Sequence, residues 1–239
     1  MECLKEKKNF SFSDAINMEN PELFLEQVDP FMQLMMQYRC ALMEVGTKLN
    51  VLNEEFAMKY NRNPFESIKS RIKTPRSIIE KLQRKGYEIS VDSIEKNLFD
   101  IAGIRVVCSF QDDIYAIARM LTQQDDIILL EEKDYIKNPT PHGYRSLHLI
   151  LDIPIFLAEE KKHMKVEVQF RTIAMDFWAS LEHKLKYKRN IENPIPVMEE
   201  LKECAEIICQ MDQKMQSIRD SIEESMEQAD RESNEKKGL

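Results

Sequence analysis

Glycine is scarce in this sequence, and its scarcity limits how a phosphate could be bound. The 239 residues include only five glycines, and no two of them are close together. The chain therefore has no Gly-x-Gly-x-x-Gly fingerprint and no glycine-rich Walker loop. A phosphate site in this protein must use lysine and arginine side chains or the N-terminus of a helix.

Cysteine patterns and long apolar runs are also missing. The five cysteines are an odd number and include no Cys-x-x-Cys pair, so neither a disulfide framework nor a zinc site is expected. No apolar run approaches the length of a membrane span, and the start of the chain lacks the layout of a signal peptide. These features predict a protein of the reducing cytoplasm with no membrane partner.

Positive charge is in deficit overall but concentrated in one segment. The formal net charge is -8, which argues against general nucleic-acid binding. Between Lys59 and Glu88, however, nine lysines and arginines stand against three glutamates. This segment is either a solvated basic surface or the site of an anionic ligand.

Apolar periodicity predicts long helices at both ends of the chain. A helix over about 22–60 carries apolar residues at alternating steps of three and four, which is typical of a heptad seam. A second seam runs from Val197 to Ile222 in a helix over about 194–226, before a polar tail. This second seam must pack either on the first long helix or on another subunit. Shorter helices are expected over 64–72, 75–85, 90–98, 112–123 and 172–188.

The helix that follows Thr74 combines clear boundaries with a basic face. A threonine–proline pair starts it, and Gly86 is placed to end it. One face of this helix, with the residue before its start, groups side chains suited to a polyphosphate: Lys73, Ser77, Lys81 and Arg84. An exposed basic helix face is the alternative interpretation.

Several stretches are typical of strands, and three of them carry chemistry. Ile104–Cys108 is preceded by Asp100 and interrupted by Arg105, a charge that is costly in a buried strand unless it is paired or bound. A strand within 127–136 begins with an apolar run. In 144–151, a period of two places Tyr144, Ser146 and His148 on one face and leucines on the other. In 165–171, the same period groups Lys165, Glu167, Gln169 and Arg171.

Two carboxylates accompany these basic and polar groups. Asp100 and Glu167 are hard oxygen ligands of the kind Mg²⁺ takes, and Mg²⁺ usually needs only one or two from the protein. Together with the basic helix face, they predict metal-assisted phosphoryl or nucleotidyl transfer.

Four motifs in order then resemble the synthetase domain of the RelA/SpoT family. They are Asp-Ile-Ala-Gly-Ile-Arg (100–105), Gly-Tyr-Arg-Ser-Leu-His (143–148), Glu-Val-Gln-Phe-Arg-Thr (167–172) and Trp-Ala-Ser-Leu-Glu-His (178–183). The whole length resembles a small alarmone synthetase. The resemblance implies an α+β fold of the nucleotidyltransferase type, with a mixed, mainly antiparallel sheet of about five strands flanked by helices. It divides the chain into an N-terminal helical extension (1–60), a catalytic domain (61–190) and a C-terminal helix with its polar tail (191–239).

The resemblance also implies an activity and roles for particular residues. The activity is Mg²⁺-dependent transfer of pyrophosphate from ATP to the 3′-hydroxyl of GDP or GTP in a bacterial cytoplasm, by a homo-oligomer that is expected to be a tetramer. Asp100 and Glu167 would bind the metal, and Glu167 would also act as the base. The residues implied for ATP are Arg71, Lys73, Ser77, Lys81, Arg84 and Arg105. Those implied for GDP or GTP are Lys133, Tyr144, Arg145, Ser146, His148, Gln169 and Asp176.

The sequence also departs from the family pattern in places. Thr140 stands where the family often has a lysine, and Asp176 stands where some relatives have an asparagine; both lie on the acceptor side. No His-Asp dipeptide occurs, so the family's hydrolase activity is not expected. Two other classes stay open: a nucleotidyltransferase that moves a nucleoside monophosphate, typically with three carboxylates, and a nucleic-acid-binding module that uses the basic segment.

Overall fold

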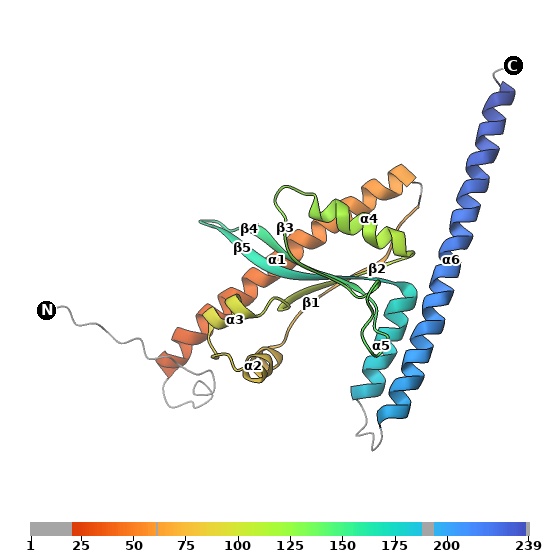
Figure 1. The fold of residues 1–239 in the computed structure, drawn as a ribbon. Coiled ribbons are helices and arrows are strands. Elements are labelled where there is room, and N and C mark those ends of the chain that lie inside the picture. Colours follow the sequence, from red (N-terminus) through yellow and green to blue (C-terminus); the bar gives the residue numbers. More distant parts are fainter. Residues whose placement is uncertain (1–20, 61, 188–193, 238–239) are drawn as a thin grey trace.

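A five-stranded sheet forms the centre of the computed structural model, which describes residues 21–60, 62–187 and 194–237 (Figure 1). The strand order is β1-β2-β5-β4-β3. β2 and β5 are parallel and the other neighbours antiparallel, so the predicted mixed, mainly antiparallel sheet is confirmed. The strands are β1 (Phe65–Ile72), β2 (Ala102–Cys108), β3 (Ile128–Asp134), β4 (Leu147–Phe156) and β5 (Lys161–Thr172).

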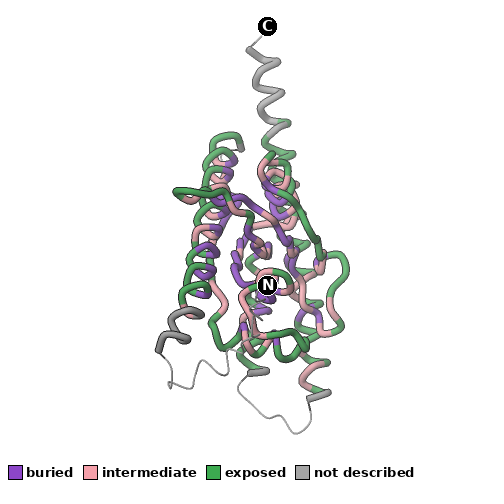
Figure 2. Tube along the Cα trace, turned by 90° about the vertical axis from the view of Figure 1, so that its left-hand side faces the viewer, coloured by how far each residue is buried: buried purple, intermediate pink, exposed green. Residues whose placement is uncertain are grey.

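Two helices cover the apolar face of this sheet. α1 (Pro21–Tyr60) runs across the strands and α4 (Gln111–Thr122) lies beside it (Figure 1). The first predicted seam is the buried side of α1, where Tyr38, Val45 and Leu49 join the same core cluster as the strands. Figure 2 shows the buried residues gathered between the helices and along the strands. The N-terminal helix is therefore part of the central core, and its seam is satisfied within one chain.

The remaining helices leave the opposite face of the sheet partly open. α2 (Pro75–Arg84) and α3 (Val91–Asn97) lie between β1 and β2 in the chain, and α5 (Ile173–Tyr187) continues directly from β5. α6 (Pro194–Lys237) packs along α5 and against α4 (Figure 1). It continues beyond the predicted end near 226, through the segment expected to be a polar tail. No helix in the described ranges is both long enough and apolar enough to cross a membrane.

The prediction of a helix over 64–72 is wrong, because this segment is the edge strand β1. Its apolar residues are three and four apart, which mimics a helical period. An irregularity in the register between Phe65 and Ser67 accounts for the spacing, since one extra residue returns Phe65 and Ile68 to the same core. From Ile68 onward the strand alternates, so Ile72 points to the core while Lys69 and Arg71 lie on the other face.

The apolar start of the strand within 127–136 does not indicate burial. Only Ile127 enters the core, and β3 exposes the three apolar residues that follow. β3 is the edge of the sheet, next to β4 alone, so its side chains lack a second neighbouring strand.

Candidate active site

Polar side chains cross the open face of the sheet in two adjacent rows. Strand register aligns one row over all five strands: Lys69, Arg105, Gln169, His148 and Lys133. The next row contains Arg71, Gly103, Glu167, Ile150 and Glu131. Directly opposed residues of neighbouring strands share a face, so the strands carry a contiguous polar surface.

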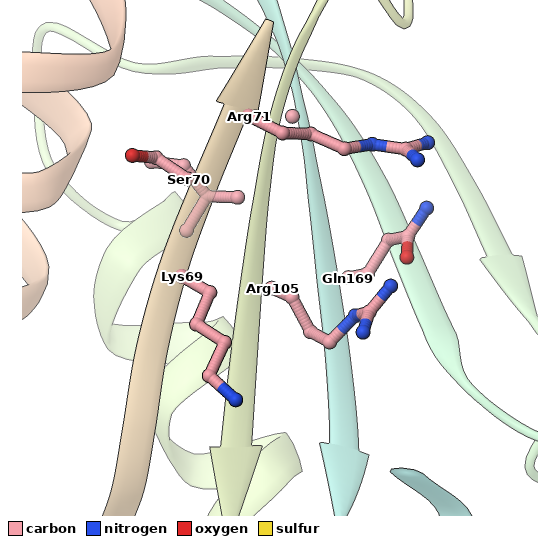
Figure 3. A pocket seen from close by; sticks show the side chains of 7 residues that line it. Lys69, Ser70, Arg71, Arg105 and Gln169 are labelled. Atoms are coloured by element: carbon pink, nitrogen blue, oxygen red, sulfur yellow. The ribbon is translucent and has the colours of Figure 1, made fainter. Parts of the chain in front are cut away.

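At the β1–β2 end of these rows, two arginines border a pocket. Arg71 and Arg105 line it together with Lys69 and Gln169, and Figure 3 shows both guanidinium groups directed to the same side with Gln169 between them. Gly103 also lines the pocket, and a Cβ there would be in ordinary van der Waals contact with the Arg71 side chain, at 3.7 Å. Burial lowers the pKa of Arg105, and the nearby Arg171 acts in the same direction. Planar cations in this setting suit stacking on a base.

Asp100 lies just before β2 and is held by two lysines. Its Oδ2 accepts hydrogen bonds from Lys73 Nζ and Lys81 Nζ, each at 2.6 Å. Burial acts to raise the pKa of Asp100, but the two lysines outweigh burial, so the pKa lies below its ordinary value. Its Oδ1 is buried with no hydrogen-bond partner among the described residues. An ionised carboxylate with one free oxygen is thus aimed into a basic cluster.

The start of α2 stands beside this carboxylate. Thr74 is the N-cap: its Oγ1 accepts from the backbone N–H of Ser77 at 3.3 Å, as predicted, and Gly86 follows the helix at φ +69°. Lys81 lies one turn after Ser77, on the helix face toward Asp100. Arg84 is exposed in the last turn, at the far end of the predicted basic face.

Glu167 lies in the middle strand of the same face. His148 Nδ1 stands 3.4 Å from Glu167 Oε1, and Gln169 Nε2 donates to Glu167 Oε2 at 2.7 Å. Burial acts to raise the pKa of Glu167, but the contacts of His148 and Gln169 lower it, and the net direction is downward. The negative charge of Asp100 works against that lowering, which shows that the two carboxylates affect each other electrostatically.

Tyr144 is presented by a tight turn built on Gly143. Gly143 adopts φ +88°, and its N–H donates to the carbonyl of Thr140 at 2.9 Å. Thr140 Oγ1 accepts from the N–H of Tyr144 at 3.2 Å, so the residue that replaces the family's frequent lysine shapes this turn. The Tyr144 ring lines a second hollow with Arg71, Arg105, Gln169 and residues of α5. The rings of Tyr135 and His148 meet it edge-on.

Arg171 ties this tyrosine to α5. Its Nη2 donates to the Tyr144 hydroxyl at 2.8 Å, and its Nη1 pairs with Asp176 Oδ1 at 3.0 Å. The same Asp176 oxygen lies 3.3 Å from Arg105 Nη1, so one carboxylate joins Arg105 and Arg171. The side chain of Arg171 is only 6% exposed.

Comparisons with known proteins fit this geometry. Residues 70–192 match the model described as the region found in RelA / SpoT proteins. The chain is 45% identical to the GTP pyrophosphokinase YwaC of Bacillus subtilis over 186 residues, which are 78% of this chain and 89% of that protein. It is 35% identical to YjbM of the same organism over 193 residues, covering 81% and 90% of the two chains.

The chain belongs to the RelA/SpoT family. Solved structures agree with the sequence match. The crystal structure of small alarmone synthetase 2 from B. subtilis superposes with a TM-score of 0.72 at 43% identity, covering 80% of this chain and 98% of that one. Small alarmone synthetase 1 from B. subtilis, bound to its product pppGpp, superposes with a TM-score of 0.73 at 35% identity, covering 80% and 97%.

One site residue predicted from the sequence lies elsewhere than expected, and a second makes a contact away from the open face. Ser146 does not share an open face with Tyr144 and His148, because β4 begins only at Leu147 and Ser146 is 0% exposed. Its hydroxyl donates to the carbonyl of Phe170 at 2.9 Å, which fastens the start of β4 to β5. Arg145 Nη1 donates to the carbonyl of Ile136, so its guanidinium binds the backbone of the loop that follows β3.

Lys133 occupies the outer end of the first row. It is the cross-strand neighbour of His148 and pairs with Glu131 at 2.9 Å. Ten of the predicted residues lie on or beside the open face: Arg71, Lys73, Lys81, Asp100, Arg105, Tyr144, His148, Glu167, Gln169 and Asp176. Ser77 and Arg84 are exposed on α2.

Arg171 and Tyr135 had not been assigned roles from the sequence. The alternation of β5 already places Arg171 on the face of Glu167 and Gln169, so periodicity gave a signal for it. Nothing local marks Tyr135, whose contacts with Tyr144 and His148 depend on strand pairing.

Proposed function

We propose that this protein is a GTP/GDP pyrophosphokinase that transfers the β,γ-pyrophosphate of ATP to the 3′-hydroxyl of GDP or GTP, making ppGpp or pppGpp. The observation that carries the proposal is one sheet face that combines a lysine-held Asp100, an arginine-lined pocket and a tyrosine platform beside Glu167. Membership of the RelA/SpoT family supports the same reaction. The YwaC and YjbM relatives are both named GTP pyrophosphokinases.

ATP occupies the β1–β2 end of the face in this proposal. Arg71 and Arg105 stack on adenine, which fits two guanidinium groups directed into one pocket (Figure 3). Lys73, Lys81 and Ser77 hold the phosphates near the start of α2, where backbone N–H groups favour anions, and Arg84 adds positive charge from the last turn of this helix. The two lysines neutralise Asp100 before substrate arrives and then share their charge with the phosphates.

Mg²⁺ is the proposed cofactor, and Asp100 and Glu167 are the residues that fit it. The buried Asp100 Oδ1 has no partner in the described part of the chain, which suits a cation that takes one carboxylate oxygen. Both carboxylates have lowered pKa values and are ionised at neutral pH, as a hard cation requires. When bound, Mg²⁺ would offset negative charge on the transferring phosphates.

The acceptor nucleotide lies on the Tyr144 side. Tyr144 stacks on guanine, and His148, Gln169, Asp176 and Lys133 border the rest of that nucleotide. Glu167 accepts the proton of the 3′-hydroxyl as that oxygen attacks the β-phosphorus, and AMP leaves. The substrates are nucleotides of the cytoplasm, so we place the reaction there.

Label transfer separates this reaction from nucleoside monophosphate transfer. The purified protein is incubated with GDP, Mg²⁺ and ATP labelled either at the α- or at the β-phosphorus. We expect the β label in the guanosine product and the α label in AMP. Transfer of the α label to the acceptor would show a nucleotidyltransferase, and no transfer of either label would overturn the proposal.

Glu167→Gln is the matched variant for that assay. The substitution is nearly isosteric, so the fold should be retained while the metal ligand and base are lost. We expect product formation to fall at least about a hundredfold, the lower range for a lost general base. A folded Glu167→Gln protein with the turnover of the original would exclude Glu167 from the mechanism.

We further propose that the protein is a homo-oligomer, expected to be a tetramer, assembled through α5 and α6. The side of α6 that packs on its own chain carries Ala205, Asp212 and Arg219, seven residues apart. The predicted seam is largely a different side. Leu201 and Ile208 of the predicted seam pack partly on their own chain, but Met211, Met215, Ile218 and Ile222 are 43–56% exposed. The nearby Ile207 and Met226 are also exposed, at 58% and 64%.

A second copy of this chain is the occupant that this surface favours. Beside the apolar row, Ser217, Ser221 and Ser225 form a row of small residues that lines a shallow hollow with Ile218 and Ile222. Small and large residues in neighbouring rows allow another helix to approach closely. α5 adds Ile173, Phe177, Leu181 and Leu185, four residues apart and all exposed, which extends the apolar surface beyond what single scattered residues explain.

A further inference from the structure

A continuous chain of hydrogen-bonding groups runs beneath the acceptor side of the site. It begins at Asp176, passes through Arg171 to the Tyr144 hydroxyl at 2.8 Å, and reaches His148 Nε2 at a further 2.8 Å. The opposite nitrogen of the same imidazole, Nδ1, faces Glu167 Oε1 at 3.4 Å. Three hydrogen bonds thus join Asp176, Arg171, Tyr144 and His148, and the longer His148–Glu167 contact extends the series to a fifth side chain.

The two ends of this chain fix its direction. An arginine can only donate, so the Tyr144 oxygen accepts from Arg171. An ionised carboxylate can only accept, so the His148 nitrogen that faces Glu167 must carry a hydrogen. A neutral imidazole with its hydrogen on Nδ1 has a bare Nε2, which can only accept. In that tautomer the Tyr144 hydroxyl donates to His148 Nε2, and each group orients the next.

We propose that Arg171 is a positioning residue for pyrophosphate transfer, which acts through the Tyr144 hydroxyl to hold His148 with its Nδ1 hydrogen directed at Glu167. The inference deepens the proposed function and rests on it. Arg171 is suited to this role because it is buried, is anchored by Asp176, and lies with its guanidinium carbon 5.2 Å from the centroid of the Tyr144 ring. Partners that fix the orientation of an active-site histidine commonly affect activity as strongly as residues that touch the substrate.

The proposal gives the tyrosine two separable functions. The ring stacks on the acceptor base, while the hydroxyl orients His148. Removing the hydroxyl alone should leave acceptor affinity nearly unchanged and slow the chemical step. A tyrosine that serves only as a stacking platform would show neither the slower step nor any change at His148.

Steady-state kinetics with ATP and GDP on Tyr144→Phe, Arg171→Gln and the double variant test this hydrogen-bonded series. We expect Tyr144→Phe to lower kcat by about ten- to a hundredfold, with KM for GDP within about twofold of the original. Arg171→Gln should lower kcat at least as much. The double variant should be no slower than Arg171→Gln, because the effects of two substitutions in one hydrogen-bonded series are not additive. Tyr87→Phe is the matched control, since the Tyr87 hydroxyl makes no hydrogen bond within the described ranges.

A spectroscopic measurement keeps the test independent of turnover. In protein labelled with ¹⁵N-histidine, the side-chain nitrogen shifts of His148 report which nitrogen carries the hydrogen. We expect the Nδ1–H form in the original protein and in Tyr87→Phe, and a gain of the Nε2–H form in Tyr144→Phe. If the original protein transfers no pyrophosphate, the proposed function fails. The His148 nitrogen shifts still show whether the hydrogen-bonded series from Arg171 to His148 is present.

Three results would overturn the inference. They are an unchanged kcat in Tyr144→Phe, additive losses in the double variant, or a His148 in the Nε2–H form in the original protein. If Arg171→Gln does not fold, Tyr144→Phe carries the test alone, since it removes one oxygen atom and leaves the Arg171–Asp176 pair in place.

Discussion

At the residue scale, Asp100 is held in its ionised form by two neighbouring lysines. Two ammonium groups share its Oδ2, and its pKa is lowered despite burial. Without the carboxylate, Lys73 and Lys81 would face each other as like charges. The cluster therefore stabilises the fold, and in the proposed reaction the same lysines would supply positive charge for the ATP phosphates.

Asp100→Asn should lower the free energy of unfolding at neutral pH by about 1–2 kcal/mol, less than fully buried charged hydrogen bonds because the groups are partly exposed. A carboxylate with a lowered folded pKa contributes stability above its ordinary pKa and loses that contribution as pH falls through the folded value. The difference between the two proteins should therefore be full at pH 7 and should close in acid. Urea unfolding at several pH values measures it.

Glu80→Gln is the control for that measurement. Glu80 pairs with Arg76 on the exposed side of α2, the helix that carries Lys81, and both side chains are mostly in solvent. Its replacement should change stability little at any pH. A difference between Asp100→Asn and the original protein that persisted in strong acid would show that packing, not charge, makes the Asp100 cluster stable.

At the scale of elements, the turn before β4 lies against α6. Gly143 adopts φ +88°, and a Cβ added there would stand 2.5 Å from the Cβ of Ala205 on α6. Trp178 of α5 donates its indole N–H to the carbonyl of Leu201 on α6 at 2.9 Å. Together these contacts place the turn that presents Tyr144 directly against the C-terminal helix.

Gly143→Ala and Gly86→Ala form a pair that separates backbone strain from steric contact. Both glycines have positive φ, but nothing lies within 4 Å of a Cβ at Gly86. Gly86→Ala should therefore cost only about 1 kcal/mol, the cost of a left-handed alanine. Gly143→Ala should cost about 2–4 kcal/mol, since the overlap with Ala205 is added. Thermal or urea unfolding measures both variants.

A smaller residue at position 205 tests whether overlap with Ala205 accounts for the extra stability lost in Gly143→Ala. Adding Ala205→Gly to Gly143→Ala removes the overlapping atom, so part of the lost stability should return despite the cost of about 1 kcal/mol for glycine in a helix. Equal losses for Gly143→Ala and Gly86→Ala, or no rescue by Ala205→Gly, would contradict the close contact between the turn and α6.

The elements differ in how far sequence alone could predict them. The helix after Thr74 was predicted because its cap, its proline and Gly86 are local signals. β1 was mistaken for a helix because one irregularity near Phe65 changes the spacing of its apolar residues, and such an irregularity is defined only by the partner strand. The burial of Ser146 likewise depends on the carbonyl of Phe170, 24 residues away. The roles that the motifs imply for site residues stay predictions, whereas the link from Arg171 to Tyr144 could not be predicted because it needs three-dimensional pairing.

At the scale of the whole molecule, the two long helices differ in how far their apolar seams are buried. α1 buries its seam on its own sheet, so this seam does not support an oligomer. α6 uses Ala205, Asp212 and Arg219 within the chain and leaves its apolar row exposed. The prediction of assembly therefore now depends on α6 and the neighbouring exposed row of α5.

Charge placed in the apolar row should break the assembly without unfolding the chain. Ile218→Glu and Ile222→Glu replace side chains that are 43% and 55% exposed, so the folded protomer loses little, whereas a helix interface cannot accept unpaired glutamates without several kcal/mol of cost. Light scattering at micromolar concentration should give a mass several times that of one 28.2 kDa chain for the original protein and the mass of a smaller species for the variants. Met58→Glu is the control, since Met58 is 92% exposed near the end of α1 and outside the row. Single-chain mass for the original protein would refute assembly altogether, and unchanged mass for the α6 variants would move the interface to another surface.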